Sequence, residues 1–306
     1  MTPVIARPTS TVTGLRLLAA SLAALVAATA AGCDGGTRAS VTGAPISVEQ
    51  LAQSASTSAH ATSGRFAFEI SATVPGAEEP FSSTGGGAFD AASKRASFSV
   101  DLSSLAKLLG GFFTAVTGAS AKDAPNLGDP AGWKIEVVQD GTVGYVRFPA
   151  VSRRLPAGTS WIRADEKGVE VDGLELTQLE QSARTDPREL LDVLRAAAGE
   201  VETVGTEELR GTETAHYRAT VDPAEYEKLV SAASLGESPA LARQLVSQAG
   251  AGPIPVDVWL DGDGLVRRLS LSSSATKPGI ADAGSASLSF ELWDYDEVVD
   301  ASALRR

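Results

Sequence analysis

The sequence predicts an α+β protein in which a curved antiparallel β-sheet is wrapped around helices on its concave side. Segments with alternating apolar and polar residues follow one another along most of the chain, and a few helical segments lie between them. Successive strands of this kind pair antiparallel, and the interposed helices bury their apolar faces against the same sheet. A hydrophobic content of 43% supports a substantial core, which forms without disulfides because Cys33 is the only cysteine.

The first 32 residues have the composition of a secretory signal peptide. Arg7 and Arg16 provide positive charge, and Leu17–Ala31 forms an uncharged run rich in leucine and alanine. This run is shorter than the ~20 apolar residues that span a bilayer comfortably. Small residues then lead directly into Cys33, which predicts cleavage just before the cysteine.

Cys33 and the small residues before it resemble the lipobox of bacterial lipoproteins. The resemblance implies that the thiol carries a diacylglyceryl group and that the new amino terminus is acylated, for example with palmitate. The alternative is a free thiol after an ordinary signal, but an odd exposed cysteine in an exported protein is a chemical liability. Two or three acyl chains anchor a protein firmly, since each buried CH₂ contributes ~0.8 kcal/mol. We therefore expect a mature protein held at the extracytoplasmic face of the cell membrane.

The acidic charge of the chain argues against nucleic acid as a partner. The formal net charge is −12, and removal of Arg7 and Arg16 with residues 1–32 makes it −14. Nucleic-acid binding depends on Lys and Arg that neutralise phosphates, and the sequence has no basic tract. The same charge disfavours peripheral contact with anionic lipid, so membrane attachment depends on the covalent anchor.

Residues 33–45 are rich in Gly, Ser and Thr and are expected to form a flexible tether.

Helix starts are marked by capping residues. A helix then begins at Ser47, which forms a capping box with Gln50, while Ile46 can pack on Leu51. Three more helices begin with a capping residue followed by proline and are predicted at residues 187–199, 223–234 and 239–250.

Strands are predicted where the apolar residues recur every second position. In the first strand Phe66, Phe68 and Ile70 share one face, and Arg65 and Glu69 share the other. Asp-Gly pairs predict hairpin turns at residues 140–141 and 261–264, because Gly tolerates positive φ. The predicted strands cover residues 64–74, 85–89, 96–102, 133–139, 142–148, 160–164, 200–205, 214–221, 255–260, 265–271 and 286–295.

The stretch from Leu102 to Val116 is unusually apolar. It contains seven large apolar residues with Lys107 among them, and Gly110-Gly111 interrupts any helix there at ~1 kcal/mol per Gly. One interpretation is a kinked core helix. The other is a mobile apolar lid over a cavity, or a segment that dips into the membrane.

Motifs of the common enzyme classes are absent from the sequence. It contains no G-x-S-x-G, H-E-x-x-H, C-x-x-C, P-loop or G-x-G-x-x-G motif. The two histidines, His60 and His216, have no recognisable serine or cysteine partner and are interpreted as surface residues. We therefore expect no enzymatic activity, no metal and no cofactor.

Three polar or glycine-rich segments have simple structural interpretations. Residues 261–264 (DGDG) lack the remaining ligands of a calcium loop, so a hairpin turn is favoured. The three glycines at 85–87 are interpreted as a place where a strand bends or starts. The acidic residues around Tyr295, at 293–297, are interpreted as a solvated strand end.

Five segments carry a family resemblance. DGTVGYVRFP, LPAGTSWIRAD, DPRELLDVLRAA, VETVGTEELRGTETAHYRATVD and PVDVWLDGDGLVRRLSL occur in this order. Together they resemble the LppX/LprG-type envelope lipoproteins of actinobacteria, which are related in fold to the LolA/LolB carriers, over residues 60–300. The resemblance implies a half-barrel with an apolar cavity between sheet and helices, and binding of a lipid or glycolipid. The chain departs from the pattern at residues 102–116.

The resemblance and the apolar strand faces together predict one lipid-binding domain at residues 46–300. A large dry cavity costs ~24 cal/mol per Å³, so it persists only when something such as an acyl chain fills it. The alternative is a surface module that serves a membrane sensor or an export complex; a membrane transporter or sensor is a possible partner in either case. The residues predicted to line the cavity or its lid are Phe66, Phe68, Ile70, Phe98, Val100, Leu105, Leu109, Phe112, Phe113, Tyr217, Val258 and Phe290.

We predict that replacing Cys33 with Ala releases the protein from the membrane, because the thioether to the lipid cannot form. Membrane fractionation together with intact-mass measurement checks this. A Cys33→Ala protein that remains firmly membrane-bound and is processed as before contradicts the prediction.

Overall fold

The computed structural model describes residues 43–73, 80–104, 106–107, 133–141, 143–149, 160–164, 170–171, 174–175, 187–232, 252–274 and 285–297. The predicted signal peptide, Cys33 and most of the tether lie outside these residues. So do Leu105, Leu109, Phe112 and Phe113 of the apolar stretch, and the helix predicted at 239–250. Their predictions therefore stay predictions.

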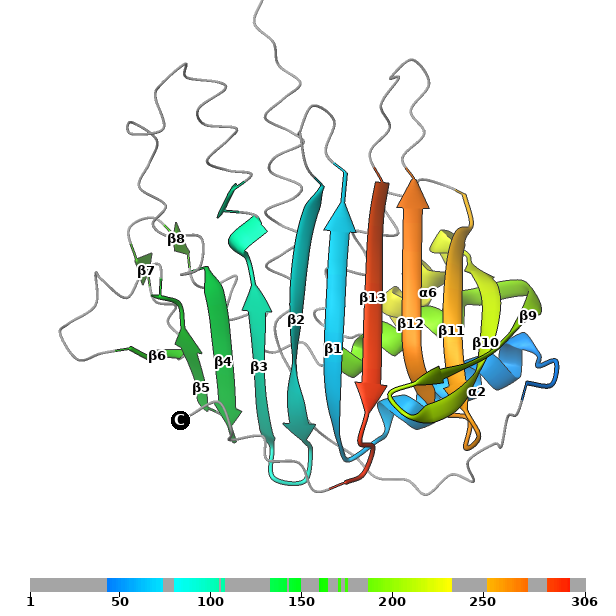
Figure 1. Ribbon diagram of the computed structural model, residues 1–306, viewed down its shortest axis with the longest axis horizontal. Helices are drawn as coiled ribbons and strands as arrows, with labels where there is room; N and C mark the ends of the chain where they lie inside the picture. Colours follow the sequence, from blue (N-terminus) through cyan, green and yellow to red (C-terminus); the bar gives the residue numbers. More distant parts are fainter. Residues whose placement is uncertain are drawn as a thin grey trace, which may run out of the picture.

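One large antiparallel sheet dominates the described residues (Figure 1). Its eleven strands follow the order β6-β5-β4-β3-β2-β1-β13-β12-β11-β10-β9, and the sheet does not close. The strands are β1 Ser63–Ala72, β2 Phe81–Asp90, β3 Arg95–Asp101, β4 Lys134–Asp140, β5 Val143–Arg147, β6 Ile162–Ala164, β9 Ala197–Leu209, β10 Thr212–Val221, β11 Ile254–Asp261, β12 Val266–Ser274 and β13 Ser285–Trp293. A separate pair, β7 (Glu170–Val171) and β8 (Leu174–Glu175), completes the strands. The predicted fold class, an open antiparallel half-barrel with few helices, is confirmed.

The predicted hairpins form where the Asp-Gly pairs lie. β4 pairs with β5 around Gly141, whose φ is 65°, and β11 pairs with β12 around a loop in which Gly264 has a φ of 74°. The β9–β10 strands are longer than expected and meet in a two-residue turn, Arg210-Gly211, in which both residues have positive φ.

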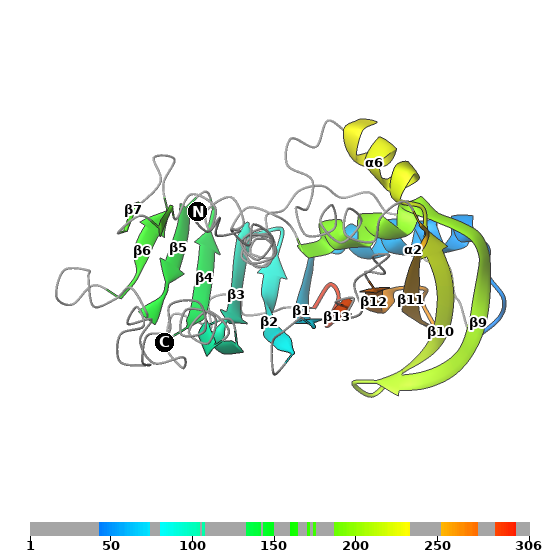
Figure 2. The same cartoon turned by 90° about the horizontal axis from the view of Figure 1, so that it is seen from above.

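Three helices lie on the concave side of the sheet (Figure 2). Helix α2 (Val48–Ala59) has the predicted capping box, with the Ser47 hydroxyl accepting from the Gln50 N–H and the Gln50 side chain accepting from the Ser47 N–H. Helix α6 (Pro223–Ala232) starts at the predicted position, where the Asp222 carboxylate accepts from the Ala224 N–H at 2.8 Å.

The helix predicted from Pro187 is only partly correct. Residues Pro187–Ala196 form a 3₁₀ helix, η2, rather than an α-helix. Strand β9 begins directly at Ala197, because Ala197 and Ala198 pair with β10. Gly199, with a φ of 77°, therefore lies inside a strand and does not end the helix as predicted. Pairing with a neighbouring strand has overridden the local helix signal.

The three glycines of β2 make room for aromatic rings and do not start the strand, which was one of the two roles that the sequence predicted. They lie in the middle of β2, where Gly85 is opposite Phe68 and Gly87 is opposite Phe66 and Phe98. A Cβ at Gly85 would overlap the Phe68 ring and lie 2.6 Å from the Ser99 carbonyl oxygen. A Cβ at Gly87 would collide with the backbone and Cβ of Phe98. The absence of side chains lets the phenylalanines of β1 and β3 pack across β2.

We predict that Gly85→Ala destabilises the fold by about 1–3 kcal/mol, because the added methyl meets a packed ring and a backbone oxygen that cannot move freely. Gly205→Ala in β9 is the matched control, since nothing lies within 4 Å of the position of its Cβ. Its effect should stay within about 0.5 kcal/mol. Urea unfolding of both variants measures this. Equally small losses of stability in both variants would show that the packing of the β1 and β3 phenylalanines does not depend on the β2 glycines.

Candidate functional site

The predicted cavity residues that the structure describes lie on one face of the sheet. Residues directly opposite one another on neighbouring strands point to the same face. One such row runs Ile135, Val100, Gly85, Phe68, Phe290, Leu269, Val258 and Tyr217, from β4 to β10. A second row runs Val146, Val137, Phe98, Gly87, Phe66 and Leu292, from β5 to β13. Ile70 lies beside Leu288 in a third row.

These side chains form a continuous apolar surface on the concave side. The structure describes eight of the residues predicted to line the cavity. Each of these eight is at most 7% exposed, and all belong to a single core cluster. The ring of Phe66 lies 6.4 Å from that of Phe98 and 6.0 Å from that of Phe290, so aromatic contacts join β3, β1 and β13. The structure thus brings together Phe66, Phe68, Ile70, Phe98, Val100, Tyr217, Val258 and Phe290.

The described helices cover this face unequally. Helix α2 packs on η2 and contacts β9 and β12, while η2 also contacts β10. The Ser58 hydroxyl of α2 accepts from the Val266 N–H at 2.8 Å, which ties the helix to β12. Figure 2 shows α2, η2 and α6 on the half of the sheet nearer β9, and none of these three lies over β3–β5. On β3–β5 the inward-facing Phe98, Val100, Val137 and Val146 are nonetheless at most 6% exposed.

The apolar stretch that begins at Leu102 starts at the edge of this surface. Leu102 and Ala106 are buried and joined by a helical hydrogen bond of 3.0 Å. The Leu102 N–H also donates to the Trp133 carbonyl, and the Trp133 ring meets Phe148 edge-on at 5.7 Å. The described start of the stretch thus packs beside β4 and β5.

Tyr217 fixes the point where the chain enters the domain. Its hydroxyl donates to the Ala44 carbonyl oxygen at 2.9 Å, and burial raises the pKa of the phenol. Gly43 lies close to Thr206 of β9. Residues 43 and 44, at the end of the predicted tether, are therefore held against the β9–β10 end of the sheet.

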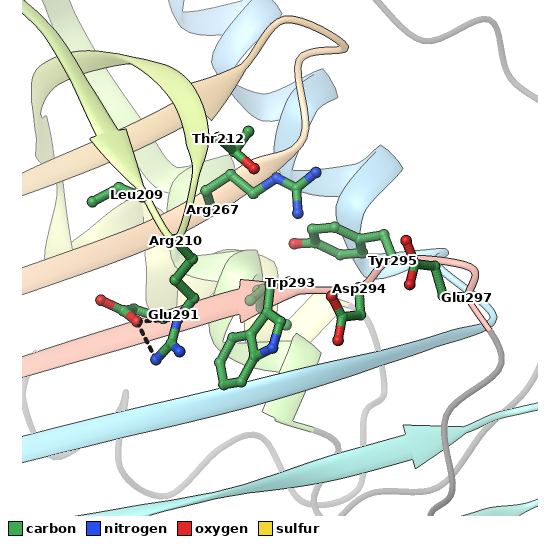
Figure 3. A pocket seen from close by; sticks show the side chains of 10 residues that line it. Leu209, Arg210, Thr212, Arg267, Glu291, Trp293, Asp294, Tyr295 and Glu297 are labelled. Carbon is green, nitrogen blue, oxygen red and sulfur yellow. Dashed lines mark hydrogen bonds and ion pairs between the residues drawn. The ribbon is translucent and has the colours of Figure 1, made fainter.

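A pocket of about 180 Å³ lies on the opposite, convex face (Figure 3). It is open beside the tip of the β9–β10 hairpin, and charged side chains dominate its lining. Such a polar pocket does not suit an acyl chain, because ligand sites for apolar molecules are lined mainly by apolar side chains. Its lining residues are Leu209, Arg210, Thr212, Arg267, Glu291, Leu292, Trp293, Asp294, Tyr295 and Glu297.

Two arginines hold Glu291, which lines this pocket. Arg268 donates to Oε1 at 3.0 and 2.5 Å, and Arg210 donates to Oε2 at 2.8 Å. Burial raises the pKa of the Glu291 carboxyl, but the hydrogen bonds and charges of Arg268 and Arg210 outweigh it. The pKa therefore lies below its ordinary value of 4.5.

The segment around Tyr295 is only in part the solvated strand end that the sequence predicted, because Asp296 and Glu297 are exposed whereas Tyr295 is buried. The buried Tyr295 hydroxyl donates to the Val266 carbonyl oxygen at 2.5 Å, and burial raises its pKa strongly. The Asp296 carboxylate accepts from the Thr62 N–H and hydroxyl at 2.7 and 2.9 Å. These contacts fasten the end of β13 to the start of β1.

His216 is on the polar face, as predicted, but it is not a free surface residue. Its side chain is 16% exposed, its Nε2 lies 2.8 Å from Asp257 Oδ1, and its ring stacks on Trp259 at 4.2 Å. His60 caps α2, with its Nδ1 at 2.6 Å from the Ser56 carbonyl oxygen. No sequence motif indicated the His216 contacts, because Asp257 and Trp259 belong to a different strand.

The DGDG loop is a hairpin turn, as predicted. Asp261 Oδ1 accepts from the N–H groups of Asp263 and Leu265, and Oδ2 accepts from Arg267 at 2.5 Å. The carboxylate is thus used by its own loop. Among the described residues there is no group of three metal-ligating side chains, and no helix is long and apolar enough to cross a membrane.

Solved structures that align with most of the chain include two mycobacterial lipoproteins. LppX of Mycobacterium tuberculosis has 15% identity over 83% of this chain and 97% of its own, with a TM-score of 0.41. LprF of Mycobacterium bovis has 12% identity over 84% of this chain and 98% of its own, also with a TM-score of 0.41. A LolA superfamily protein from Nitrosomonas europaea has 8% identity over 85% of this chain and 97% of its own, with a TM-score of 0.26.

These structures include the LppX-type lipoproteins and the LolA superfamily, the groups that the sequence resembles. A scan of protein-family models and a search of curated proteins each gave no match. At these identities and TM-scores, a function for this chain has to rest on its own residues.

We predict that Glu291 makes the stability of the fold depend on pH in the acidic range. Because the pKa of Glu291 is lower in the folded protein, its contribution to the free energy of unfolding is complete above about pH 4.5. The contribution is lost as the pH falls through the folded pKa. Glu291→Gln should flatten the fall in stability as the pH drops below about 4.5, as measured by urea midpoints. Glu69→Gln, an exposed change on β1, is the control. Parallel curves for the wild type and Glu291→Gln would contradict the prediction.

Proposed function

We propose that this protein is a membrane-anchored envelope lipoprotein that binds the acyl chain of a lipid or glycolipid against the concave face of β3–β5. The observation that carries the proposal is the continuous apolar register across β1–β5 on the concave face, where α2, η2 and α6 do not lie over β3–β5. A carrier role without catalysis fits the absence of enzyme motifs in the sequence. A membrane transporter or sensor is the kind of partner expected for such a carrier.

The chemistry of the face matches an acyl chain. Phe98, Val100, Val137 and Val146 present only carbon atoms, and each CH₂ that leaves water there contributes ~0.8 kcal/mol. The row of apolar residues crosses the strands from β5 to β1, so a chain lying along it meets a continuous surface. Leu102, where the apolar stretch predicted as a lid or a kinked core helix begins, lies at the edge of this surface.

The proposed anchor and the entry point of the chain are compatible. Gly43, which lies against β9, is ten positions after Cys33, and a flexible segment of that length spans about 17 Å on average. Lipidation of Cys33 would therefore hold the β9–β10 end close to the membrane. The face of β3–β5 lies at the other end of the sheet.

We predict that Val146→Phe, on β5, reduces acyl-chain binding about tenfold or more while the melting temperature changes little. The larger ring takes up space proposed for the acyl chain, and α2, η2 and α6 do not lie over β5. Val256→Phe on β11 is the matched control, since it faces the half covered by helices and should destabilise by about 1–3 kcal/mol. Titration with a fluorescent fatty-acyl probe and thermal melting of both variants measure this.

Mass spectrometry of lipid that co-purifies with the wild type should identify an acylated molecule. Two results would overturn the proposal. One is a wild type that neither co-purifies with lipid nor binds the probe. The other is a Val146→Phe variant that loses stability as Val256→Phe does and binds the probe as before, because β3–β5 would then be ordinary core.

A further inference from the structure

The polar pocket on the convex face is a site that acyl-chain binding does not use. It has a volume of about 180 Å³ and lies between the tip of the β9–β10 hairpin and the end of β13 (Figure 3). Pockets for drug-sized ligands usually measure ~300–1,000 Å³, so this one has room for a single small ring. Two of its lining residues, Glu291 and Trp293, alternate along β13 with Phe290 and Leu292 of the apolar rows.

Contacts on both sides hold the walls of this pocket in place. On the hairpin side, Arg210 donates to Glu291 Oε2 at 2.8 Å and lies 3.8 Å above the Trp293 ring. On the other side, the buried Tyr295 hydroxyl donates to the Val266 carbonyl oxygen at 2.5 Å. The pocket is therefore already shaped before a ligand enters, as is usual for small-molecule sites.

The backbone of the lining is unusual. Among the described residues, four residues other than glycine have a positive φ, and two of them, Arg210 (51°) and Asp294 (53°), line this pocket. Aspartate adopts this conformation more readily than most residues, but arginine does not. Disfavoured backbone conformations gather at ligand sites, where the surrounding structure holds them.

The charges of the lining are largely matched within the protein. Two arginines and three acidic residues line the pocket. Arg210 pairs with Glu291, Arg267 donates to the Asp261 carboxylate at 2.5 Å, and Asp294 pairs with an arginine of β1 at 3.0 Å. A charged ligand would meet groups of its own sign beside groups that already have partners, and like charges in contact are costly. The lining therefore favours a neutral ligand.

Two polar side chains of the lining are available to such a ligand. Among the described residues, neither the Thr212 hydroxyl nor the Glu297 carboxylate has a hydrogen-bond or ion-pair partner. A ligand hydroxyl can donate to the carboxylate, and it can donate to or accept from the threonine. Leu209 and Trp293 add carbon surface beside them. A ring with hydroxyls at its rim and C–H groups on its faces matches both kinds of surface.

We propose that this pocket binds one ring of a neutral saccharide. Thr212 of the hairpin and Glu297 after β13 bind its hydroxyls from the two walls, and Trp293 contacts its C–H groups. Free oligosaccharides and glycolipid head groups present this same chemistry. The site is independent of the acyl-chain function proposed above, because its polar lining is on the convex face and the apolar rows are on the concave one.

The experiment titrates full-length protein, in a detergent without a sugar head group, with neutral hexose and pentose trisaccharides. Calorimetry gives the affinity. The indole N–H signal of Trp293, assigned with a Trp293→Phe variant, gives the place of binding. The test variants are Thr212→Val and Glu297→Gln. Their matched controls are Thr206→Val and Glu213→Gln, which change exposed residues of the same hairpin outside the lining.

We expect a neutral trisaccharide to shift the Trp293 signal. Thr212→Val should weaken its binding about fivefold and Glu297→Gln about tenfold, because hydrogen bonds to charged groups contribute more than neutral ones. Both controls should bind within about twofold of the wild type, and the melting temperatures of all four variants should change by no more than about 3 °C, since these are surface substitutions. Trisaccharides that carry a uronic acid or an amino sugar should bind more weakly.

Three results would overturn the inference. They are a Trp293 signal that no neutral trisaccharide shifts in the millimolar range, unchanged affinity in both Thr212→Val and Glu297→Gln, and tighter binding of the charged trisaccharides.

An alkyl glycoside of the same sugar separates the two sources of the ring, and Val146→Phe separates this site from the acyl-chain site. If only the alkyl glycoside binds and Val146→Phe abolishes that binding, the saccharide site is wrong while the proposed function stands. If the trisaccharide binds wild type and Val146→Phe equally, the saccharide site stands, even where the wild type binds no fatty-acyl probe and the proposed function fails.

Discussion

The pairing of β1 with β13 is the contact on which the rest of the structure depends. It joins a meander of strands β1–β6 to another of strands β9–β13, because β13 lies between β1 and β12. On the concave side Phe66 and Phe68 meet Leu292 and Phe290 across this seam. Beyond its end, Asp296 and Thr62 close the junction between residues 234 positions apart. Without the seam, the apolar rows would stop at β1, and the concave face would be divided.

The two faces of the sheet have opposite chemistry and different roles. The concave face is apolar from β5 to β10, so its stabilisation comes from removing carbon surface from water. The convex face carries the alternate residues of the same strands, and there Arg210, Arg268, Glu291 and His216 form hydrogen bonds and stacking contacts. Period-two alternation thus separates a surface suited to an acyl chain from one that fixes the shape of the sheet.

The proposed function combines these features. Residues 43 and 44 and the β9–β10 hairpin lie at one end of the sheet, and the apolar face of β3–β5 lies at the other. The β2 glycines let phenylalanines from β1 and β3 share a continuous surface across β2. In the proposed function, the bound lipid lies at the end of the sheet opposite to residues 43 and 44.

Local patterns in the sequence determined most of the fold. Alternation placed Phe66, Phe68, Phe98 and Phe290 on one face, and Ser47 with Gln50 marked the start of α2. These features depend on neighbours in the chain, which the sequence shows directly. The choice of the concave face as the apolar one followed from the same alternation.

Only the tertiary structure decided the features that depend on residues far apart. The start of β9 at Ala197 and the role of Gly85 follow from pairing with β10, β1 and β3. Glu291 meets Arg210 across 81 positions. His216 meets Asp257 across 41. No periodicity encodes such contacts, because strand order and register decide them, and these are set by how the whole sheet buries its apolar rows.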